Sequence, residues 1–407
     1  MIALHLRNSE RRFHPRKQER ISAYAKRSMR RLAISLAIAS LIAMTAASPA
    51  LAADPPFTTV LGGLHNPRGL AFGANGRLYV AEAGLGSGTT DEGIGFNGSI
   101  DEIKNPDSNH PKVRTVVWGL ASHGSLEGET EGIDGISVQG NNIVGIMAES
   151  QDATGDASFG KLLKVTPSGT TKDIANVGSL NYAWTGSVVG NPAYDPGDQY
   201  PDSNPYGVLS LPGRQYVVDA GANTLNEVRP DGTVRILAFF PNIYIPEIDF
   251  TTDATPTCVA KGPDGALYIG TLALVPCLFE GPVAKIYRVD PSTLGPGYPG
   301  GPVPVLGPQQ EWATGFWSIH GIAFGPDGSL YVSELFTHVD LSVDFPFSGG
   351  DVKKLPFAHP SQHISLTNDQ LSFPAGVAVG PHGAVYVVNG STYVEVGGGE
   401  VVRLTNH

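Results

Sequence analysis

Cysteine is scarce in this chain: only two of its 407 residues are Cys, at positions 258 and 277. That number excludes a small disulfide-rich scaffold, so a hydrophobic core must hold the fold together. Both cysteines fall within one repeat unit of the pattern described below. If the protein is exported, one disulfide between Cys258 and Cys277 is expected, and two buried free thiols are the alternative.

Familiar catalytic motifs are also missing. The sequence contains no Gly-x-Ser-x-Gly elbow, no His-Glu-x-x-His pattern and no Cys-x-x-Cys pair. These motifs place, respectively, an activated serine, a zinc ion with its general base, and a redox or metal-binding dithiol. Nucleophilic catalysis of a familiar type therefore has no support in the sequence.

Positive charge is scarce as well, because the chain has 27 Lys/Arg against 38 Asp/Glu. Ten of the basic and two of the acidic residues lie within residues 1–52, so the remainder carries 17 basic and 36 acidic side chains and a formal net charge of −19. Such an acidic body repels nucleic acid and anionic membranes, and we expect neither as a partner. It favours solubility outside the cell and is compatible with cation binding.

Residues 1–53 have the pattern of an export signal. A basic stretch ends at Arg31, an apolar run follows over residues 32–44, and small residues lead to a cleavage site near Ala53. The apolar run is short for a bilayer span and no second run follows, so no membrane anchor is expected. Because 28 residues ahead of Met29 are unusual for such a signal, Met29 is the expected translation start. The protein is predicted to be secreted or periplasmic, and we expect a monomer.

A strand–turn–strand unit recurs along the rest of the chain. Its clearest copy, residues 319–334, has two apolar β-rich runs around Pro326-Asp327-Gly328, whose residues favour a tight turn. Equivalent positions recur at residues 69, 135, 207, 258, 321 and 376, at intervals of 51 to 72 residues. Such long, irregular periods suit four-stranded propeller blades. The sequence therefore predicts an all-β fold, a six-bladed β-propeller forming a single domain over residues 54–407.

The two ends of the predicted propeller complement each other. The sixth unit stops after its third strand, Glu400–Leu404, because the chain ends at His407. The segment Phe57–Leu64 is similar to residues 113–120, the outer strand of the first unit, in its period and its final Gly-Leu. We expect this segment to supply the missing strand and close the ring, which leaves no blade incomplete.

Polar residues are expected around the mouth of the central channel. The second strand of each blade ends on the rim where the first strand begins, so the residues at these points surround the axis. The second-strand ends are Glu82, Glu149, Asp219, Thr271, Glu334 and Asn389. The first-strand starts are Arg68, Asp134, Tyr206, Thr257, His320 and Ala375. Most long insertions fall on the same rim, which marks it as the binding face.

Three roles for these residues stay open. Carboxylates around one axis repel each other unless water, a counter-charge or a cation lies among them. They can form a hydrated rim balanced by Arg68 and His320, hold structural Ca²⁺, or provide a catalytic metal or acid–base site. Calcium is the one cofactor that the sequence indicates. The candidate calcium ligands are Glu82, Glu149, Asp219 and Glu334.

Four further patterns also have ordinary explanations. Gly93–Gly98 matches a dinucleotide-binding fingerprint, but it is expected in a loop and opens no helix. Asp195–Asn204 can wrap a calcium ion or form a plain turn. A histidine and three nearby glutamates can bind a metal or form a solvated acidic loop: His123, Glu127, Glu129 and Glu131. Four tryptophans can stack on a ligand or pack the propeller: Trp118, Trp184, Trp312 and Trp317.

Several segments together resemble the ScyD/ScyE family of exported propeller proteins. They are Asn66–Leu70, Leu78–Gly84, Asp202–Gly207, Val218–Leu225 and Gly262–Gly270. The resemblance extends over nearly all of the chain after the signal and implies an exported propeller of the NHL-like or SMP-30-like kind. It implies no reaction, because the family's biochemical role is not established. At Thr271–Cys277 the chain departs from the Gly-Glu-Leu-Thr-Gly-like run usual in the family, so one acid is missing from the channel mouth.

Two functions are compatible with these features. The first is a non-catalytic exported propeller that binds a small ligand or a protein partner through its long-loop rim. The second is an enzyme with its site at the channel mouth, either a Ca²⁺-dependent lactonase or hydrolase or a quinone-dependent sugar dehydrogenase. His320-Gly321 ahead of Phe324–Gly328 is similar to the dehydrogenases, whereas the acidic mouth would repel an anionic quinone.

Overall fold

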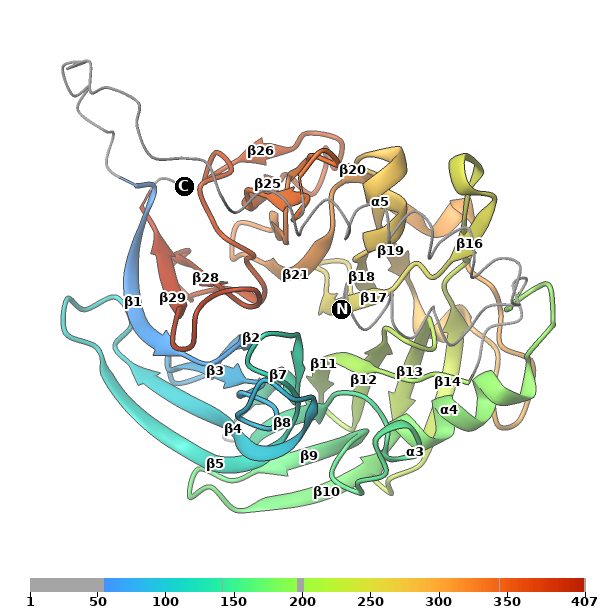
Figure 1. Cartoon of the computed structure of the whole chain (residues 1–407), viewed down its shortest axis with the longest axis horizontal. Coiled ribbons are helices and arrows are strands. Elements are labelled where there is room, and N and C mark those ends of the chain that lie inside the picture. Colours follow the sequence, from blue (N-terminus) through green and yellow to red (C-terminus); the bar gives the residue numbers. More distant parts are fainter. Residues whose placement is uncertain (1–54, 141, 196–200, 344, 406–407) are drawn as a thin grey trace, which may run out of the picture.

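The computed structural model describes residues 55–140, 142–195, 201–343 and 345–405. Six sheets of four or five strands stand radially around a central axis (Figure 1). This arrangement confirms the predicted all-β, six-bladed β-propeller. The expected export signal lies outside the described residues. Within the described ranges, no helix has the length and apolar character needed to cross a membrane.

The first three blades follow one another along the chain. The first blade contains β2 (Pro67–Phe72), β3 (Leu78–Glu82), β4 (Gly93–Lys104), β5 (Lys112–Gly124) and the short β6 (Thr130–Glu131). The second contains β7 (Ile133–Gln139), β8 (Asn142–Met147), β9 (Lys161–Val165) and β10 (Thr171–Asn176). The third contains β11 (Pro205–Leu211), β12 (Arg214–Asp219), β13 (Thr224–Val228) and β14 (Val234–Phe239).

The last three blades complete the ring. The fourth contains β17 (Pro256–Lys261), β18 (Leu267–Thr271), β19 (Ala284–Val289) and β20 (Glu311–Phe316). The fifth contains β21 (Ile319–Phe324), β22 (Leu330–Glu334), β25 (Asp351–Leu355) and β26 (Ile364–Ser365). The sixth contains β27 (Val377–Val379), β28 (Val385–Asn389), β29 (Gly399–Leu404) and, from the other end of the chain, β1 (Phe57–Leu64).

The ring closes as the sequence predicts. Strand β1 pairs antiparallel with β29, with Phe57 opposite Leu404 and Thr59 opposite Val402. The Thr59 hydroxyl also donates a hydrogen bond to the Glu400 carboxylate at 2.6 Å. The first described strand and the last strand therefore lie side by side in one sheet (Figure 1).

The second strand of the first blade is buried, and glycines close the hairpin turns. All five residues of β3 are buried, because each inner strand is covered on both faces by neighbouring blades. Gly76 and Gly328 close the turns of their hairpins with φ of 72° and 78°, and a Cβ at either position would meet no atom within 4 Å. These two glycines are therefore needed for their backbone angle and not for space.

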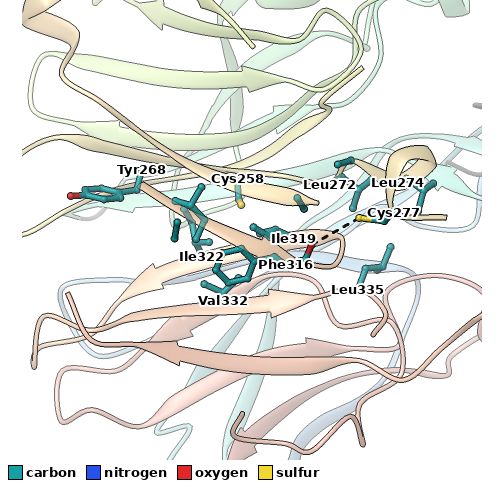
Figure 2. Packing of buried hydrophobic residues seen from close by; sticks show 14 of the residues in the cluster. Cys258, Tyr268, Leu272, Leu274, Cys277, Phe316, Ile319, Ile322, Val332 and Leu335 are labelled. Atoms are coloured by element: carbon teal, nitrogen blue, oxygen red, sulfur yellow. Dashed lines mark hydrogen bonds between the residues drawn. The ribbon is translucent and has the colours of Figure 1, made fainter. Parts of the chain in front are cut away.

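The hydrophobic core lies between neighbouring blades. Figure 2 shows one such cluster between the fourth and fifth blades, where Tyr268 and Phe316 pack with Ile322 and Val332. The two cysteines lie in this cluster, and both are free and buried. The expected disulfide is therefore not formed, and the alternative of two buried thiols holds. Burial raises the pKa of Cys258 to about 12 and that of Cys277 to about 11.

The rim contains structure that the sequence did not indicate. Short helices lie in its connections: α3 (Gln151–Thr154), α4 (Val177–Ser187) and α5 (Leu274–Glu280). Two small ribbons accompany them: β15 (Ile243–Ile245) with β16 (Phe250–Thr252), and β23 (His338–Val339) with β24 (Phe347–Ser348). The prediction of a loop at Gly93–Gly98 is wrong. This segment opens β4, because Ile94 pairs with His123 and extends the hairpin toward the rim.

Candidate functional site

Three rings of residues from the six inner strands line the central channel, which encloses about 100 Å³. The ring at the strand starts consists of Arg68, Asp134, Tyr206, Thr257, His320 and Ala375. The middle ring consists of Gly69, Gly135, Gly207, Cys258, Gly321 and Gly376. The third ring is aliphatic: Leu70, Ile136, Val208, Val259, Ile322 and Val377. The structure thus brings the six first-strand starts together, and a ligand role for them stays a prediction.

Arg68 and Asp134 are buried at the mouth together with Glu131. Nη2 of Arg68 donates to the carbonyl oxygen of Thr130 at 2.9 Å, and the N–H of Gly132 donates to Oδ1 of Asp134 at 3.2 Å. Burial and the neighbouring Glu131 raise the pKa of Asp134 well above its usual range, although the charge of Arg68 opposes this shift. Burial therefore favours the neutral form of the Asp134 carboxyl group, whereas the charge of Arg68 favours its ionised form.

Tyr206 and His320 form a second buried pair across the channel. The Tyr206 hydroxyl lies 2.7 Å from Nε2 of His320, and the two rings are stacked with their centroids 5.4 Å apart. Burial, reinforced by the charge of Arg68, lowers the pKa of His320 to about 3. His320 is therefore neutral at physiological pH. Arg68 alone supplies the positive charge that the sequence-based interpretation assigned to both residues.

At four of the second-strand ends, the side chain binds a backbone N–H group and does not line the channel. Each accepts a hydrogen bond from the N–H of a residue just ahead of the first strand of its own blade. With the donor first, the pairs are His65 to Glu82 (2.6 Å), Asn204 to Asp219 (2.7 Å), Trp317 to Glu334 (2.7 Å) and Ser372 to Asn389 (2.7 Å). Repetition of one bond in four blades indicates a structural clamp that sets the entry of each inner strand.

Glu149 and Thr271 depart from this pattern. Glu149 has a left-handed backbone, with φ of 56°, and its carboxylate lies 2.8 Å from Nδ1 of His123. That hydrogen bond raises the pKa of His123, while burial raises the pKa of Glu149. The Thr271 hydroxyl instead donates to the carbonyl of Lys285 at 3.2 Å. Glu149 therefore binds a side chain of the first blade, and Thr271 binds the backbone of its own blade.

The structure does not gather the candidate calcium ligands into one site. Among the described residues, no three carboxylate, imidazole or thiol groups lie close enough together to hold a metal ion. Glu334 is instead paired with Nζ of Lys353 at 2.5 Å. In the predicted loop Asp195–Asn204, residues 196–200 lie outside the described part. Calcium binding therefore remains a prediction.

The four tryptophans are spread over the molecule. Trp118 is 61% exposed on β5, whereas Trp184 is buried in α4 against Tyr194 and Phe239. Trp312 and Trp317 are partly buried and pack on Tyr268 and Phe336, respectively. Three of the four therefore contribute to packing, and no pair of them forms a stacking platform.

A cavity lies on the rim, where connections of the first, fifth and sixth blades meet. This rim pocket has a volume of about 320 Å³. It is lined by His65, Asn66, Leu85, Ser125, Leu126, Glu127, Gly128, Phe345, Tyr393, Val394, Glu395, Val396 and Gly397. Apart from Glu127, sequence reasoning missed these residues. Long insertions on this rim were the only available signal.

Two residues of the rim pocket have left-handed backbones, which is unusual for one of them. Asn66 and Tyr393 are both left-handed, with φ of 47° and 54°. For a bulky aromatic residue this conformation is rare and is held only where the surrounding structure enforces it. Such strain concentrates at ligand-binding sites, and Tyr393 also interacts electrostatically with Arg68 at the channel mouth. The pocket and the mouth are thus neighbouring parts of one face.

The pH dependence of stability tests the clamp role of Glu82. Burial raises the pKa of Glu82 from 4.5 to about 7, although the bonds from His65 and Ser99 oppose the shift. A carboxyl group whose pKa is higher in the folded state contributes its full stability below the unfolded pKa and loses it as pH rises through the folded pKa. We therefore expect the free energy of unfolding to decrease between pH 4.5 and about 7. Asp219, whose pKa burial raises to about 6, acts in the same direction.

The measurement is urea unfolding at several pH values for the natural protein and for Glu82→Gln. Glutamine resembles the neutral carboxyl group, so this variant should show a clearly shallower decrease while Asp219 still titrates. Identical slopes for the two proteins would mean that Glu82 keeps an ordinary pKa in the folded state.

Comparisons with known proteins place the chain among six-bladed propellers. No family model matches it, and no curated protein matches it. Among solved structures, it is similar to a putative oxidoreductase (glucose dehydrogenase) from Thermus thermophilus, with 15% identity, a TM-score of 0.50, and coverage of 86% of this chain and 99% of that one. Virginiamycin B lyase from Staphylococcus aureus has 12% identity, a TM-score of 0.42, and coverage of 86% and 99%. A nidogen/laminin complex has 13% identity, a TM-score of 0.44, and coverage of 73% and 84%. At these identities the similarity establishes the fold alone.

Proposed function

We propose that this protein is an exported propeller of the ScyD/ScyE kind that binds a small molecule in its rim pocket without transforming it. Export is supported by the pattern of residues 1–53, and the acidic remainder of the chain suits a soluble protein outside the cell. The single observation that carries the binding role is the rim pocket. Its volume of about 320 Å³ lies at the lower end of the roughly 300–1,000 Å³ typical of small-molecule sites.

The chemistry of the pocket lining supports binding of a partly apolar molecule. Leu85, Leu126 and Phe345 supply apolar surface, and Asn66 and Ser125 supply amide and hydroxyl groups. The lining thus combines apolar and polar surface, which suits a molecule that has both. Because Tyr393 is held in a strained conformation, this part of the pocket is preorganised and a ligand need not order it.

Binding is favoured over catalysis because the polar groups of the channel mouth are enclosed. Arg68, Asp134 and His320 are 2%, 1% and 5% exposed. A general acid, base or electrophile must come within hydrogen-bonding distance of a substrate, and these groups have almost no exposed surface from which to do so. The enzyme alternative would need the mouth to open. Calcium at the second-strand ends is not part of the proposal, because Glu82, Asp219 and Glu334 accept backbone hydrogen bonds and Glu149 is paired with His123.

Filling the pocket tests the proposal. The probe is phenylbutanol, a neutral molecule with an apolar body, and its binding is measured by ligand-observed NMR titration. Leu126→Trp places an indole in the pocket, so we expect at least a tenfold loss of affinity, about 1.4 kcal/mol. The matched control is Ile248→Trp, because Ile248 has the same 39% exposure as Leu126 but lies on another part of the rim.

The two variants should have the same unfolding midpoint, since both sites are half-exposed. If Leu126→Trp binds phenylbutanol as well as the control does, the ligand site lies elsewhere. If the natural protein does not bind phenylbutanol at all, the rim pocket is not a site for neutral, partly apolar molecules.

A further inference from the structure

The aromatic wall of the rim pocket is rigid and accessible. The rings of Phe345 and Tyr393 lie 5.1 Å apart, and Phe373 packs against both at 5.7 and 5.8 Å. Phe373 is itself left-handed, with φ of 47°, so two of the three residues have a backbone conformation that is rare for aromatic residues. Phe345 is 44% exposed, and it therefore presents part of a ring to the pocket. The negative face of an aromatic ring attracts organic cations.

Two carboxylates also line the pocket. Glu127 belongs to the first blade and Glu395 to the sixth, and both are exposed. Within the described part of the chain, neither carboxylate has a hydrogen-bond or ion-pair partner. Many other acidic residues of this protein are engaged, for example Glu102 with Arg77 and Glu334 with Lys353. The negative charge of Glu127 and Glu395 is therefore not neutralised by the protein.

Positive charge is missing from the same lining. None of the described residues that line the pocket is Lys or Arg. The body of the protein is also acidic overall, so its wider field has the same sign as the two carboxylates. An anionic ligand would meet repulsion from both sources, whereas a cation would be attracted by both.

Building on the proposed function, we propose that the ligand of the rim pocket is an organic cation with an apolar body, such as an aliphatic or aromatic amine. The apolar body packs on Leu85, Leu126 and Phe345, and the ammonium group lies between Glu127 and Glu395. Exposed ion pairs and exposed cation–π contacts each contribute modestly. Together they give an expected preference of about tenfold for a cation over a neutral molecule of the same shape.

Three probes with one apolar body separate charge from shape. They are phenylbutylammonium, phenylbutanol and phenylpentanoate, and each is titrated against the same protein at low salt. We expect the ammonium compound to bind about tenfold more tightly than the alcohol, and the carboxylate to bind least tightly. Raising the salt concentration should weaken the ammonium compound and leave the alcohol almost unchanged, because only the former is screened.

Glu127→Gln combined with Glu395→Gln should bring the affinities of the ammonium compound and the alcohol to within about twofold of each other. The alcohol itself should bind as before, since its contacts are retained. The matched control is Asp173→Asn, which removes an exposed carboxylate from β10 of the second blade and should leave the preference unchanged.

The outcomes distinguish the two proposals. Three results would overturn the cation assignment and leave the pocket as a ligand site. The natural protein could bind the ammonium compound and the alcohol equally, or it could prefer the carboxylate. The preference for the cation could also survive in the double variant. Binding of none of the three probes would overturn the rim-pocket function and the cation assignment together.

Discussion

Replacing Gly135 by alanine is expected to lower the free energy of unfolding by about 3 kcal/mol or more. Gly135 lies in the middle ring of the channel, where neighbouring inner strands approach closely. A Cβ at this position would lie 2.3 Å from the backbone oxygen of Tyr206 and 2.8 Å from a methyl group of Ile146. The backbone of the third blade cannot rotate away as a side chain can, so the ring itself must shift.

The same constraint applies around the ring. A Cβ on Gly207 would lie 2.4 Å from the oxygen of Thr257, and one on Gly376 would lie 2.5 Å from the oxygen of Arg68. The matched control is Gly295→Ala, because that glycine is exposed, has no left-handed backbone and has no atom within 4 Å of the added carbon. Its effect should stay within about 1 kcal/mol. Equal stability of the two variants in urea unfolding would show that the inner strands are less tightly packed than the structure indicates.

Removal of β1 is expected to have the second large effect. A chain without residues 1–64 loses the strand that pairs with β29, together with the side chains that this strand packs on the core. Leu64 is buried, and Phe57, Val60 and Leu61 pack on two of the interblade clusters. At roughly 1.5–3 kcal/mol for each fully buried apolar side chain, the loss is on the order of 5 kcal/mol. It also leaves β29 as an open edge that favours aggregation.

The matched comparison is a chain without residues 1–54, which keeps every described strand. Thermal unfolding and light scattering of the two chains measure stability and association. We expect the shorter chain to unfold at a clearly lower temperature, and a peptide of residues 55–64 to restore the midpoint in part. If both chains unfold at one temperature, β1 does not close the ring in solution.

Some of the fold was predictable because local rules repeat. The Pro-Asp-Gly and related turns occur between runs of apolar and β-branched residues, and six copies are enough to count the blades. The pairing of Phe57–Leu64 with the last strand also followed from counting, because one strand was missing at the end of the chain. These predictions depended only on two rules. Side chains alternate between the two faces of a strand, and the unpaired backbone groups of an edge strand favour pairing with another strand.

The channel mouth was predicted only in part, and the reason is a recurring backbone irregularity. The pairing register shifts by one residue near the start of the first strand in five blades, for example between Ile133 and Gly135 and between Ile319 and Gly321. Such a bulge re-aims the side chains around it. Residues such as Asp134 and His320 therefore face the axis. Glu334, which pairs with Ile319 on the neighbouring strand, instead accepts a hydrogen bond from the N–H of Trp317.

The rim pocket was not predictable from the sequence. Its lining comes from connections of three blades that lie far apart in the chain, such as Leu126, Phe345 and Val396. No motif joins these residues, and each looks like an ordinary loop residue by itself. The left-handed backbone of Tyr393 is likewise imposed by surrounding contacts and not by residue type, because tyrosine has no local preference for it.

The amino-acid sequence by itself determined the number of blades, the closure of the ring and the acidic character of the protein, because these properties depend on short-range alternation, turn residues and formal charge. Only the tertiary structure decided which polar groups face the channel, that the two cysteines stay unpaired, and where a pocket opens on the rim. Those features depend on the packing angle of neighbouring blades and on how their connections meet in space, and neither quantity is encoded in any single repeat.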